Sequence, residues 1–191
     1  PFTYPAGRIR IPNDSKSRAG GVLYSDYSLG RFFAEAARQP WFENTIFLVT
    51  ADHCASSAGR TEIPLQKYHI PALILAPGLI EPGVVDGIVS QIDLMPTLLS
   101  LLKRSYDSHF YGRSIFDPAY VNRAFIATYQ DLGYLEGDTF TILSPVRRFE
   151  QYRVVPTEEN PHHLEAMERK DAVQVDRAIG YYQTSCKWNK R

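Results

Sequence analysis

An aspartate and a histidine stand side by side at the end of an apolar run, and both side chains can bind a metal ion. Residues from Ile46 to Ala51 are apolar or β-branched without a break, which predicts a strand buried on both faces, as in the middle of a parallel sheet. Asp52 and His53 follow where this strand should end. Ligands of open α/β sheets bind outside the carboxyl ends of the strands, so the pair lies where a site is expected. An aspartate that caps the next turn and a hydrogen-bonded histidine explain the two residues equally well.

The composition is that of an ordinary globular protein. The chain has 191 residues, of which 44% are hydrophobic and 22% charged, enough for one domain with a core or for two small ones. Lysine plus arginine and aspartate plus glutamate both number 21, so no net field favours nucleic acid and we expect no nucleic-acid partner. Cys54 and Cys186 form no CxxC pattern and predict neither a disulfide framework nor a zinc finger.

A helix is predicted before the apolar run. It begins at a cap formed by Ser25 or Asp26 and ends at Pro40. Gly30 lies inside it and costs a helix roughly 1 kcal/mol, so we expect it to permit close packing. The apolar face follows the helical spacing and comprises Leu29, Phe32, Phe33 and Ala36.

A second strand and a second helix are predicted after the run. Residues 72–76 form a continuous apolar strand that Pro77 ends. Residues 90–103 form a helix with Asp93 as its N-cap. We interpret Asp93 as this cap rather than as a metal ligand.

From residue 105 onward the pattern changes to short stretches of strand character separated by turns. The predicted strands are 124–129, 139–143 and 147–155, with turns at Gly133 and at residues 136–138. A final helix carries Val175, Ile179, Tyr182 and Cys186 at helical spacing.

We therefore expect an α/β fold in which a predominantly parallel sheet is flanked by helices. Residues 1–116 hold this sheet, and residues 117–191 add a small antiparallel sheet and a terminal helix within the same domain.

Several short motifs follow one another in a fixed order. They are Leu29-Gly30-Arg31-Phe32, Trp41-Phe42-Glu43-Asn44-Thr45, Thr50-Ala51-Asp52-His53, Tyr68-His69-Ile70-Pro71, Ala76-Pro77-Gly78, Ser90 to Leu99, and Phe110-Tyr111-Gly112-Arg113-Ser114. Over about residues 22–116 their order and spacing resemble the second half of the sulfatase-like catalytic domain of the alkaline phosphatase superfamily. The branch that they resemble most is that of the lipoteichoic acid synthases and phosphoglycerol transferases.

The resemblance implies a metal-dependent enzyme in which a threonine, serine or modified cysteine attacks a phosphate or sulfate ester. Asp52 and His53 match the family's Asp-His metal ligands. A carboxylate oxygen with a neutral imidazole suits Zn²⁺ or Mn²⁺, with Mg²⁺ and Ca²⁺ as alternatives. The family's nucleophile and first acidic ligand lie in the first half of the domain. We therefore expect no catalytic nucleophile in residues 1–191, which should be inert toward esters when metal is added.

The resemblance also implies partners and a location. The substrate would be a phospholipid or a glycan phosphate, and the parent enzyme would be extracytoplasmic, held by a transmembrane anchor in an absent N-terminal region. Relatives place a substrate-contacting histidine just before a Pro-Phe pair, which would lie immediately ahead of Pro1-Phe2. A sheet divided through its middle exposes apolar edges, so self-association of the chain is a further expectation.

Three residues near the pair are weaker candidates for substrate binding: Cys54, Arg60 and His69. Cys54 stands where many relatives have glycine, and a third ligand, an oxidisable thiol or a small buried residue would explain it. Arg60 suits bidentate contact with a phosphate or is a solvated loop arginine. His69 precedes the second strand and lies at the opposite end from His53 if the two strands are parallel. It meets substrate or metal only if its loop folds back.

Three further polar residues, Arg113, His162 and His163, could contribute to a site. Arg113 has the same two interpretations as Arg60. His162 and His163 are adjacent in a polar loop, and neighbours on an extended chain point to opposite faces, which argues against a shared metal.

Two further functions stay open. One is sulfate ester hydrolysis, which a C/S-x-P-x-R nucleophile motif would indicate, whereas a threonine nucleophile would indicate phosphoryl transfer. The other is a non-catalytic module that uses this fold to bind a partner or a lipid head group. A flavodoxin-like or nucleotide-binding domain is disfavoured because no glycine-rich phosphate loop follows a strand.

Overall fold

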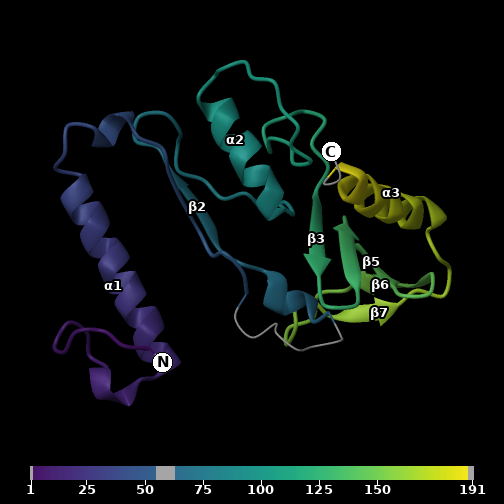
Figure 1. Cartoon of the computed structure of the whole chain (residues 1–191), viewed down its shortest axis with the longest axis horizontal. Helices are drawn as coiled ribbons and strands as arrows, with labels where there is room; N and C mark the ends of the chain where they lie inside the picture. The colour runs from purple at the N-terminus through teal and green to yellow at the C-terminus, as the bar shows by residue number, and fades with distance from the viewer. Residues whose placement is uncertain (1, 55–62, 189–191) are drawn as a thin grey trace. The chain divides into compact units, whose positions relative to one another are not determined.

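The computed structural model describes residues 2–54 and 63–188, which fall into two compact units (Figure 1). The first unit comprises the residues up to Phe47 together with Ile74–Glu81, and the second comprises Leu48–Leu73 together with the residues from Pro82 onward. The predicted division at residue 116 stays a prediction. No helix among the described residues is long and apolar enough to cross a lipid bilayer.

The helix of the first unit, α1 (Arg18–Ala36), begins seven or eight residues before its predicted cap, which was Ser25 or Asp26. Its N-cap is Ser17, whose hydroxyl oxygen accepts a hydrogen bond from the Gly20 N–H at 3.1 Å. A Cβ atom at Gly20 would lie 2.1 Å from the Tyr4 hydroxyl oxygen. Glycine therefore stands inside this helix because the N-terminal segment packs directly on its backbone, and packing overrides the low helix propensity of glycine.

Aromatic rings gather at the C-terminal end of α1. Phe32 and Phe33 of the helix meet the ring of Phe47 with centroids 6.0 and 5.4 Å apart. The ring of Phe42, in the short 3-10 helix η2 (Phe42–Asn44), also lies 5.4 Å from Phe47. The first unit's other 3-10 helix is η1 (Asn13–Ser15). These contacts order the turn that leads into the first strand.

One face of α1 nevertheless stays uncovered by the described residues. Of the four residues in its predicted apolar face, only Ala36 is buried, and Leu29 and Phe32 are exposed. No described atom comes within 4 Å of a Cβ built at Gly30. The prediction that Gly30 permits close packing is therefore wrong for the described part of the chain.

Strands β1 (Phe47–Thr50) and β2 (Ala72–Leu75) form a two-stranded sheet. All four positions of β1 are half-buried, so the prediction of a strand buried on both faces is wrong. The Ala51 N–H donates to the Pro71 carbonyl at 3.4 Å, which joins the end of β1 to the residue just before β2. The two strands therefore run in opposite directions, and the segment that precedes β2 lies at the same end of the sheet as Asp52.

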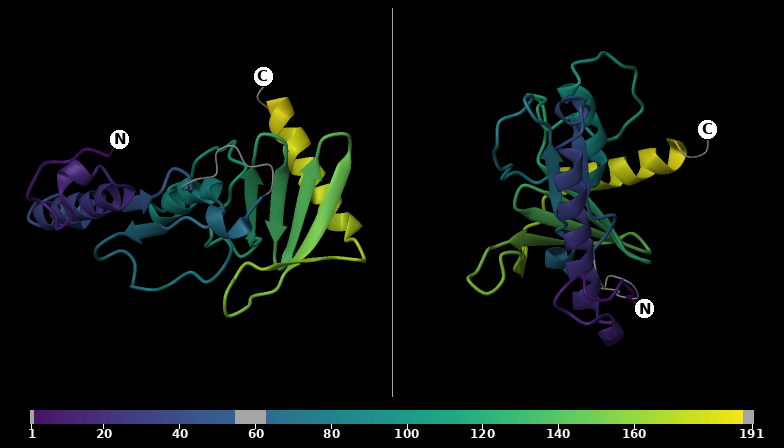
Figure 2. Two further views of the ribbon diagram at one scale, coloured as in Figure 1. Left: turned by 90° about the horizontal axis from the view of Figure 1, so that it is seen from below. Right: turned by 90° about the vertical axis from the view of Figure 1, so that its left-hand side faces the viewer.

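The second unit contains a five-stranded antiparallel sheet in the order β3-β4-β5-β6-β7 (Figure 2). The strands are β3 (Arg123–Ala127), β4 (Leu132–Glu136), β5 (Thr139–Ser144), β6 (Arg148–Val154) and β7 (Leu164–Ala166). Gly133 was predicted to lie in a turn, but it lies in β4. A Cβ atom at this position would lie 2.8 Å from the ring of Phe140, so the lack of a side chain makes room for that ring. Sequence analysis found β3, β5 and β6 and missed β4 and β7.

The two faces of this sheet are covered differently. On one face Ile126, Leu135 and Phe140 pack with Leu65, which belongs to the short 3-10 helix η3 (Leu65–Tyr68). The other face carries the predicted terminal helix, α3 (Ala172–Trp188). The predicted α/β class with a small antiparallel sheet in the C-terminal part is confirmed.

Polar contacts fix α3 to its face of the sheet. The Gln151 side chain donates to the Thr141 hydroxyl at 2.9 Å and to the Asp171 carbonyl at 3.0 Å, just before the helix begins. Near the other end of α3 the Tyr182 hydroxyl donates to the carbonyls of Ile126 and Gly133 at 3.1 and 3.0 Å. Burial raises the pKa of Tyr182 to about 12, which keeps this donor protonated.

The turn between β5 and β6 is strained. Val146 and Arg147 have φ angles of 62° and 57°, in the left-handed region that favours glycine and asparagine. This conformation costs other residues roughly 1–2 kcal/mol each. Val146 is 90% exposed, so its side chain gains little from packing.

Replacing Val146 by asparagine and Arg147 by glycine should raise the free energy of unfolding of the second unit by about 1–2 kcal/mol, after the greater backbone freedom of glycine is discounted. Urea denaturation followed by circular dichroism measures the change. Val84→Asn, at another exposed valine of the same unit, should leave stability unchanged. A double variant no more stable than the wild type would contradict the strain.

Candidate functional site

Asp52 and His53 stand immediately beyond β1 with their functional atoms close together. The Asp52 Oδ1 accepts a hydrogen bond from the His53 backbone N–H at 2.9 Å. The other carboxylate oxygen, Oδ2, lies 3.5 Å from the His53 Nε2. The side chain of Asp52 is 88% exposed and that of His53 is 75% exposed. Both atoms are therefore open to a ligand that approaches from solvent.

The backbone carbonyl of Cys54 sets the tautomer of the His53 ring. The ring Nδ1 lies 2.8 Å from the Cys54 carbonyl oxygen, and since a carbonyl can only accept, this nitrogen carries the proton. In a neutral imidazole the lone pair is then on Nε2. Metal-binding histidines are held in the same way, with the second ring nitrogen donating to a carbonyl or carboxylate. Cys54 itself is buried and acts on His53 through its backbone.

The pair fits two positions of a tetrahedral metal centre. Bonds of about 2.0–2.2 Å from zinc to nitrogen and oxygen place two tetrahedral ligand atoms roughly 3.3–3.6 Å apart, and the observed Oδ2 to Nε2 distance is 3.5 Å. Within residues 2–54 and 63–188, no group of three or more histidine, cysteine, aspartate or glutamate side chains could hold a metal ion. Asp52 and His53 can thus supply part of a centre.

Gln91 fixes the backbone from which this pair projects, and sequence analysis missed it. It begins the short 3-10 helix η4 (Gln91–Asp93). Its amide donates to the carbonyl oxygens of Ala51 and Asp52 at 3.2 and 3.0 Å. The sequence offered one signal, a glutamine inside the Ser90-to-Leu99 motif, but its partners lie about 40 residues earlier.

The carboxylate of Asp93 is buried two residues after Gln91 and collects five hydrogen bonds. Asp93 occupies the N-cap position of α2 (Leu94–Leu101), where its side chain makes no capping bond, but it completes a capping box with Ser90 at the start of η4, so the predicted helix cap is confirmed one turn earlier than expected. The donors are the backbone N–H groups of Ser90 at 3.0 Å and Arg113 at 2.8 Å, the Tyr120 hydroxyl at 3.0 Å, and two guanidinium nitrogens of Arg123 at 2.9 and 3.1 Å.

Electrostatic interactions within this cluster keep the Arg123 guanidinium charged and the Tyr120 hydroxyl protonated. Desolvation lowers the pKa of Arg123, but its hydrogen bonds to Asp93 and the charge of that carboxylate outweigh burial and raise the pKa above the ordinary value. Burial, and then the charge of Asp93, raise the pKa of Tyr120. A Cβ at Gly112 would meet the Ile92 carbonyl oxygen at 1.9 Å, so only glycine lets the next backbone N–H reach Asp93.

Removing the Asp93 carboxylate should strongly destabilise the protein. Asp93→Ala leaves the guanidinium of Arg123 buried without its partner, which costs about 3–5 kcal/mol, as urea denaturation would measure. Asp93→Ala combined with Arg123→Met should cost less than the sum of the single changes. As a control, Asp138→Ala breaks a half-exposed ion pair with Arg153, worth about 1 kcal/mol or less. Equal losses in both would contradict the role of burial.

His69 lies beside His162 in the structure. The rings are nearly perpendicular, with centroids 5.4 Å apart. His69 ends η3, at the same end of the two-stranded sheet as Asp52, so the alternative based on parallel strands does not apply. Arg60 lies outside the described residues. Arg113 enters the site region through its backbone, and its side chain is exposed.

The contact between the two histidines predicts lower stability in mild acid. Burial, and then the charge of His69, lower the pKa of His162, so the folded state binds a proton less readily than the unfolded chain. Stability should therefore fall as the pH drops below the ordinary histidine pKa of about 6.5. His162→Gln should reduce this fall in denaturation curves from neutral to mildly acidic pH, and His163→Gln should not. Equal pH dependence in both variants would contradict the prediction.

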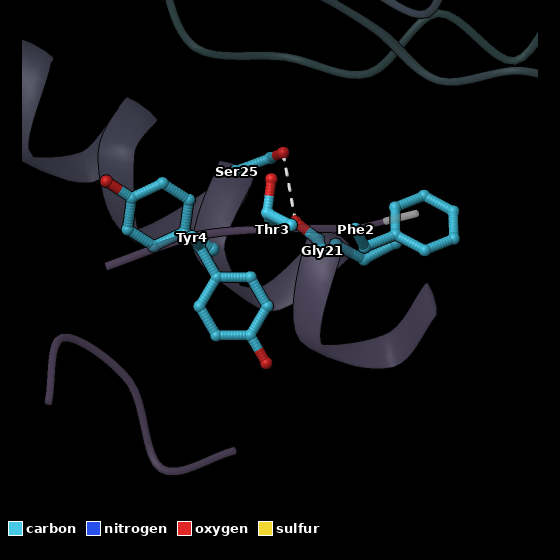
Figure 3. A pocket seen from close by; sticks show the side chains of 7 residues that line it. Phe2, Thr3, Tyr4, Gly21 and Ser25 are labelled. Carbon is cyan, nitrogen blue, oxygen red and sulfur yellow. Dashed lines mark hydrogen bonds between the residues drawn. The ribbon is translucent and has the colours of Figure 1, made fainter. Parts of the chain in front are cut away.

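The first unit holds a pocket of about 460 Å³ between the N-terminal segment and α1 (Figure 3). It is lined by Phe2, Thr3, Tyr4, Gly21, Val22, Tyr24 and Ser25. The Ser25 hydroxyl is already engaged with the Gly21 carbonyl at 3.1 Å. The lining contains no histidine, cysteine or carboxylate, so the pocket offers no metal ligands.

Comparisons with known proteins place this geometry in context. Residues 5–104 match the family model described as Sulfatase. Among solved structures, the chain is similar to a protein in the alkaline phosphatase superfamily from Vibrio parahaemolyticus, with a TM-score of 0.82 and 31% sequence identity. The match covers 96% of this chain and 46% of that protein. This chain thus spans less than half the length of the Vibrio protein.

Proposed function

The chain belongs to the sulfatase family, in the alkaline phosphatase superfamily, and from this premise we propose that Asp52 and His53 are one side of a divalent-metal centre acting on phosphate esters. The family acts on phosphate or sulfate esters, and the superfamily is generally metal-dependent. The observation that carries the proposal is the 3.5 Å separation of two exposed atoms, Asp52 Oδ2 and His53 Nε2.

Each residue around the pair has a distinct part in the proposal. Asp52 offers a negative oxygen and His53 a neutral nitrogen, a donor set that suits Zn²⁺ or Mn²⁺. The Cys54 carbonyl holds the histidine in the required tautomer, and the Gln91 amide holds the backbone. A divalent cation, when bound, would neutralise charge on the ester and lower the pKa of the attacking group.

We further propose that the nucleophile and the remaining ligands come from polypeptide outside residues 1–191. Two observations support this: the chain spans 46% of the similar Vibrio protein, and α1 presents the exposed apolar residues Val22, Leu29 and Phe32. Such a face is ordinarily buried in a domain. The rest of the catalytic domain would cover it, and self-association would cover it when the chain is alone.

The substrate class that we propose is the head-group phosphodiester of a phospholipid or a glycan phosphate, transferred outside the cytoplasm by a membrane-anchored parent enzyme. The order of motifs from Leu29 to Ser114 supports this branch. Sulfate ester hydrolysis is the second candidate, and the match to the family model described as Sulfatase favours it. The identity of the nucleophile, threonine or a residue in C/S-x-P-x-R, separates the two.

Metal binding tests the proposed centre directly. Isothermal titration of residues 1–191 with Zn²⁺ and Mn²⁺ should show binding that Asp52→Asn and His53→Ala each remove. Gln91→Ala should weaken binding by about tenfold or more, the usual loss when a supporting hydrogen bond is deleted.

Matched controls are available in the same unit. Asp86→Asn and His163→Ala remove exposed side chains of the same types and should leave metal affinity unchanged. The wild-type chain with metal should hydrolyse neither bis(p-nitrophenyl) phosphate nor p-nitrophenyl sulfate. Unchanged metal affinity without Asp52 and His53 would contradict the proposed centre, and turnover that depends on them would contradict an external nucleophile.

A further inference from the structure

Two turns lie at one end of the five-stranded sheet. Ala127 pairs with Leu132 across the β3–β4 turn, and Leu132 also pairs with Leu143. Leu143 in turn pairs with Phe149 across the β5–β6 turn. Residues 128–131 and 145–147 are therefore neighbours, and Figure 2 shows both turns at the same end of the sheet as the C-terminal end of α3. We call these two turns, with Phe149, the turn end.

Apolar side chains project from the turn end into solvent. Val146 is 90% exposed, Tyr129 is 83% exposed and Phe149 is 42% exposed. Single exposed apolar residues are common on protein surfaces. Val146 and Tyr129 come from two adjacent turns and Phe149 from the start of β6, and three exposed apolar residues at one end of a sheet indicate a contact surface.

The conformation of the two turns does not require these residues. The β3–β4 turn is closed by Thr128, whose hydroxyl oxygen accepts the Asp131 N–H at 3.0 Å and whose backbone N–H donates to the Asp131 carbonyl at 2.9 Å. Tyr129 contributes only its exposed ring. In the β5–β6 turn Val146 and Arg147 occupy left-handed positions that favour asparagine and glycine. Backbone strain of this kind occurs at functional sites, which is consistent with a function for the exposed side chains.

The charge of the turn end is positive. Arg147 and Arg148 are both exposed, and Lys187 lies in the last turn of α3. Asp131, within the β3–β4 turn, and Glu150, next to Phe149 in β6, are the nearby carboxylates, so these three cations outnumber two anions. The Glu150 carboxylate accepts a hydrogen bond from the Tyr152 hydroxyl at 2.5 Å and keeps its negative charge.

We propose that the turn end docks on an anionic lipid bilayer. Val146, Tyr129 and Phe149 would enter the boundary between head groups and acyl chains, where aromatic rings are favoured. Arg147 and Arg148 would meet lipid phosphates, toward which basic side chains near a membrane surface are drawn. Projecting tips suit a flat, yielding surface better than they suit the groove of a protein. This inference goes beyond the proposed function, because Asp52 and His53 have no part in it.

Vesicle co-sedimentation of residues 1–191 tests the proposal. The wild type should bind equimolar phosphatidylglycerol–phosphatidylcholine vesicles, and bind pure phosphatidylcholine more weakly. Raised salt should weaken binding to the anionic vesicles. The variant Val146→Asn with Arg147→Gly should bind them at least about fivefold more weakly, the factor that one basic residue contributes near such a surface. Tyr129→Ser should also weaken binding.

The controls separate docking from loss of folding. The Val146→Asn, Arg147→Gly variant is expected to be more stable than the wild type, so weaker binding cannot come from unfolding. Val84→Asn with Arg169→Gly removes the same side-chain types from exposed positions outside the turn end and should bind as the wild type does. Failure of the wild type to bind anionic vesicles, or equal binding by both double variants, would overturn the proposal. A protein partner would then be the alternative occupant of the turn end.

Discussion

The ion pair between Asp93 and Arg123 is the interaction on which the second unit depends most. Burying two charges is unfavourable unless each is paired and its remaining hydrogen-bonding groups are satisfied. Here the carboxylate accepts five hydrogen bonds, and the guanidinium lies 5.4–5.8 Å from three aromatic ring centroids. Because the donors come from residues 90, 113, 120 and 123, one side chain fixes the start of α2, the loop after it and the first strand of the antiparallel sheet.

The candidate site is exposed, whereas the Asp93–Arg123 pair is buried, and the site is attached to the elements that this pair holds together. Asp52 and His53 are exposed, and their free atoms are left available for a ligand. Their backbone is held by Gln91, which stands two residues before Asp93 in η4. The buried, fully satisfied pair is thus linked through one short helix to the open pair. This division, with rigidity in the buried cluster and reactivity in the exposed one, is what a metal site requires of its support.

Local patterns in the sequence predicted the elements whose signals are local. Strands β3, β5 and β6 and the helix α3 follow from alternation and helical spacing, and Asp52 and His53 stand where an apolar strand ends. The start of α1 and strand β4 were missed because glycines at positions 20 and 133 are chosen for close contact with Tyr4 and Phe140, not for a turn. The roles of Asp93 and Gln91 depend on partners 20 to 40 residues away, which spacing alone does not reveal.

Asp52 and His53 are proposed to bind one metal ion together. The most direct measurement is anomalous diffraction from crystals of this protein grown with Zn²⁺ or Mn²⁺. We expect a metal peak about 2.0–2.2 Å from both Asp52 Oδ2 and His53 Nε2. A metal peak at other side chains, such as the His69 and His162 pair, with Asp52 and His53 left unbound, would contradict the claim.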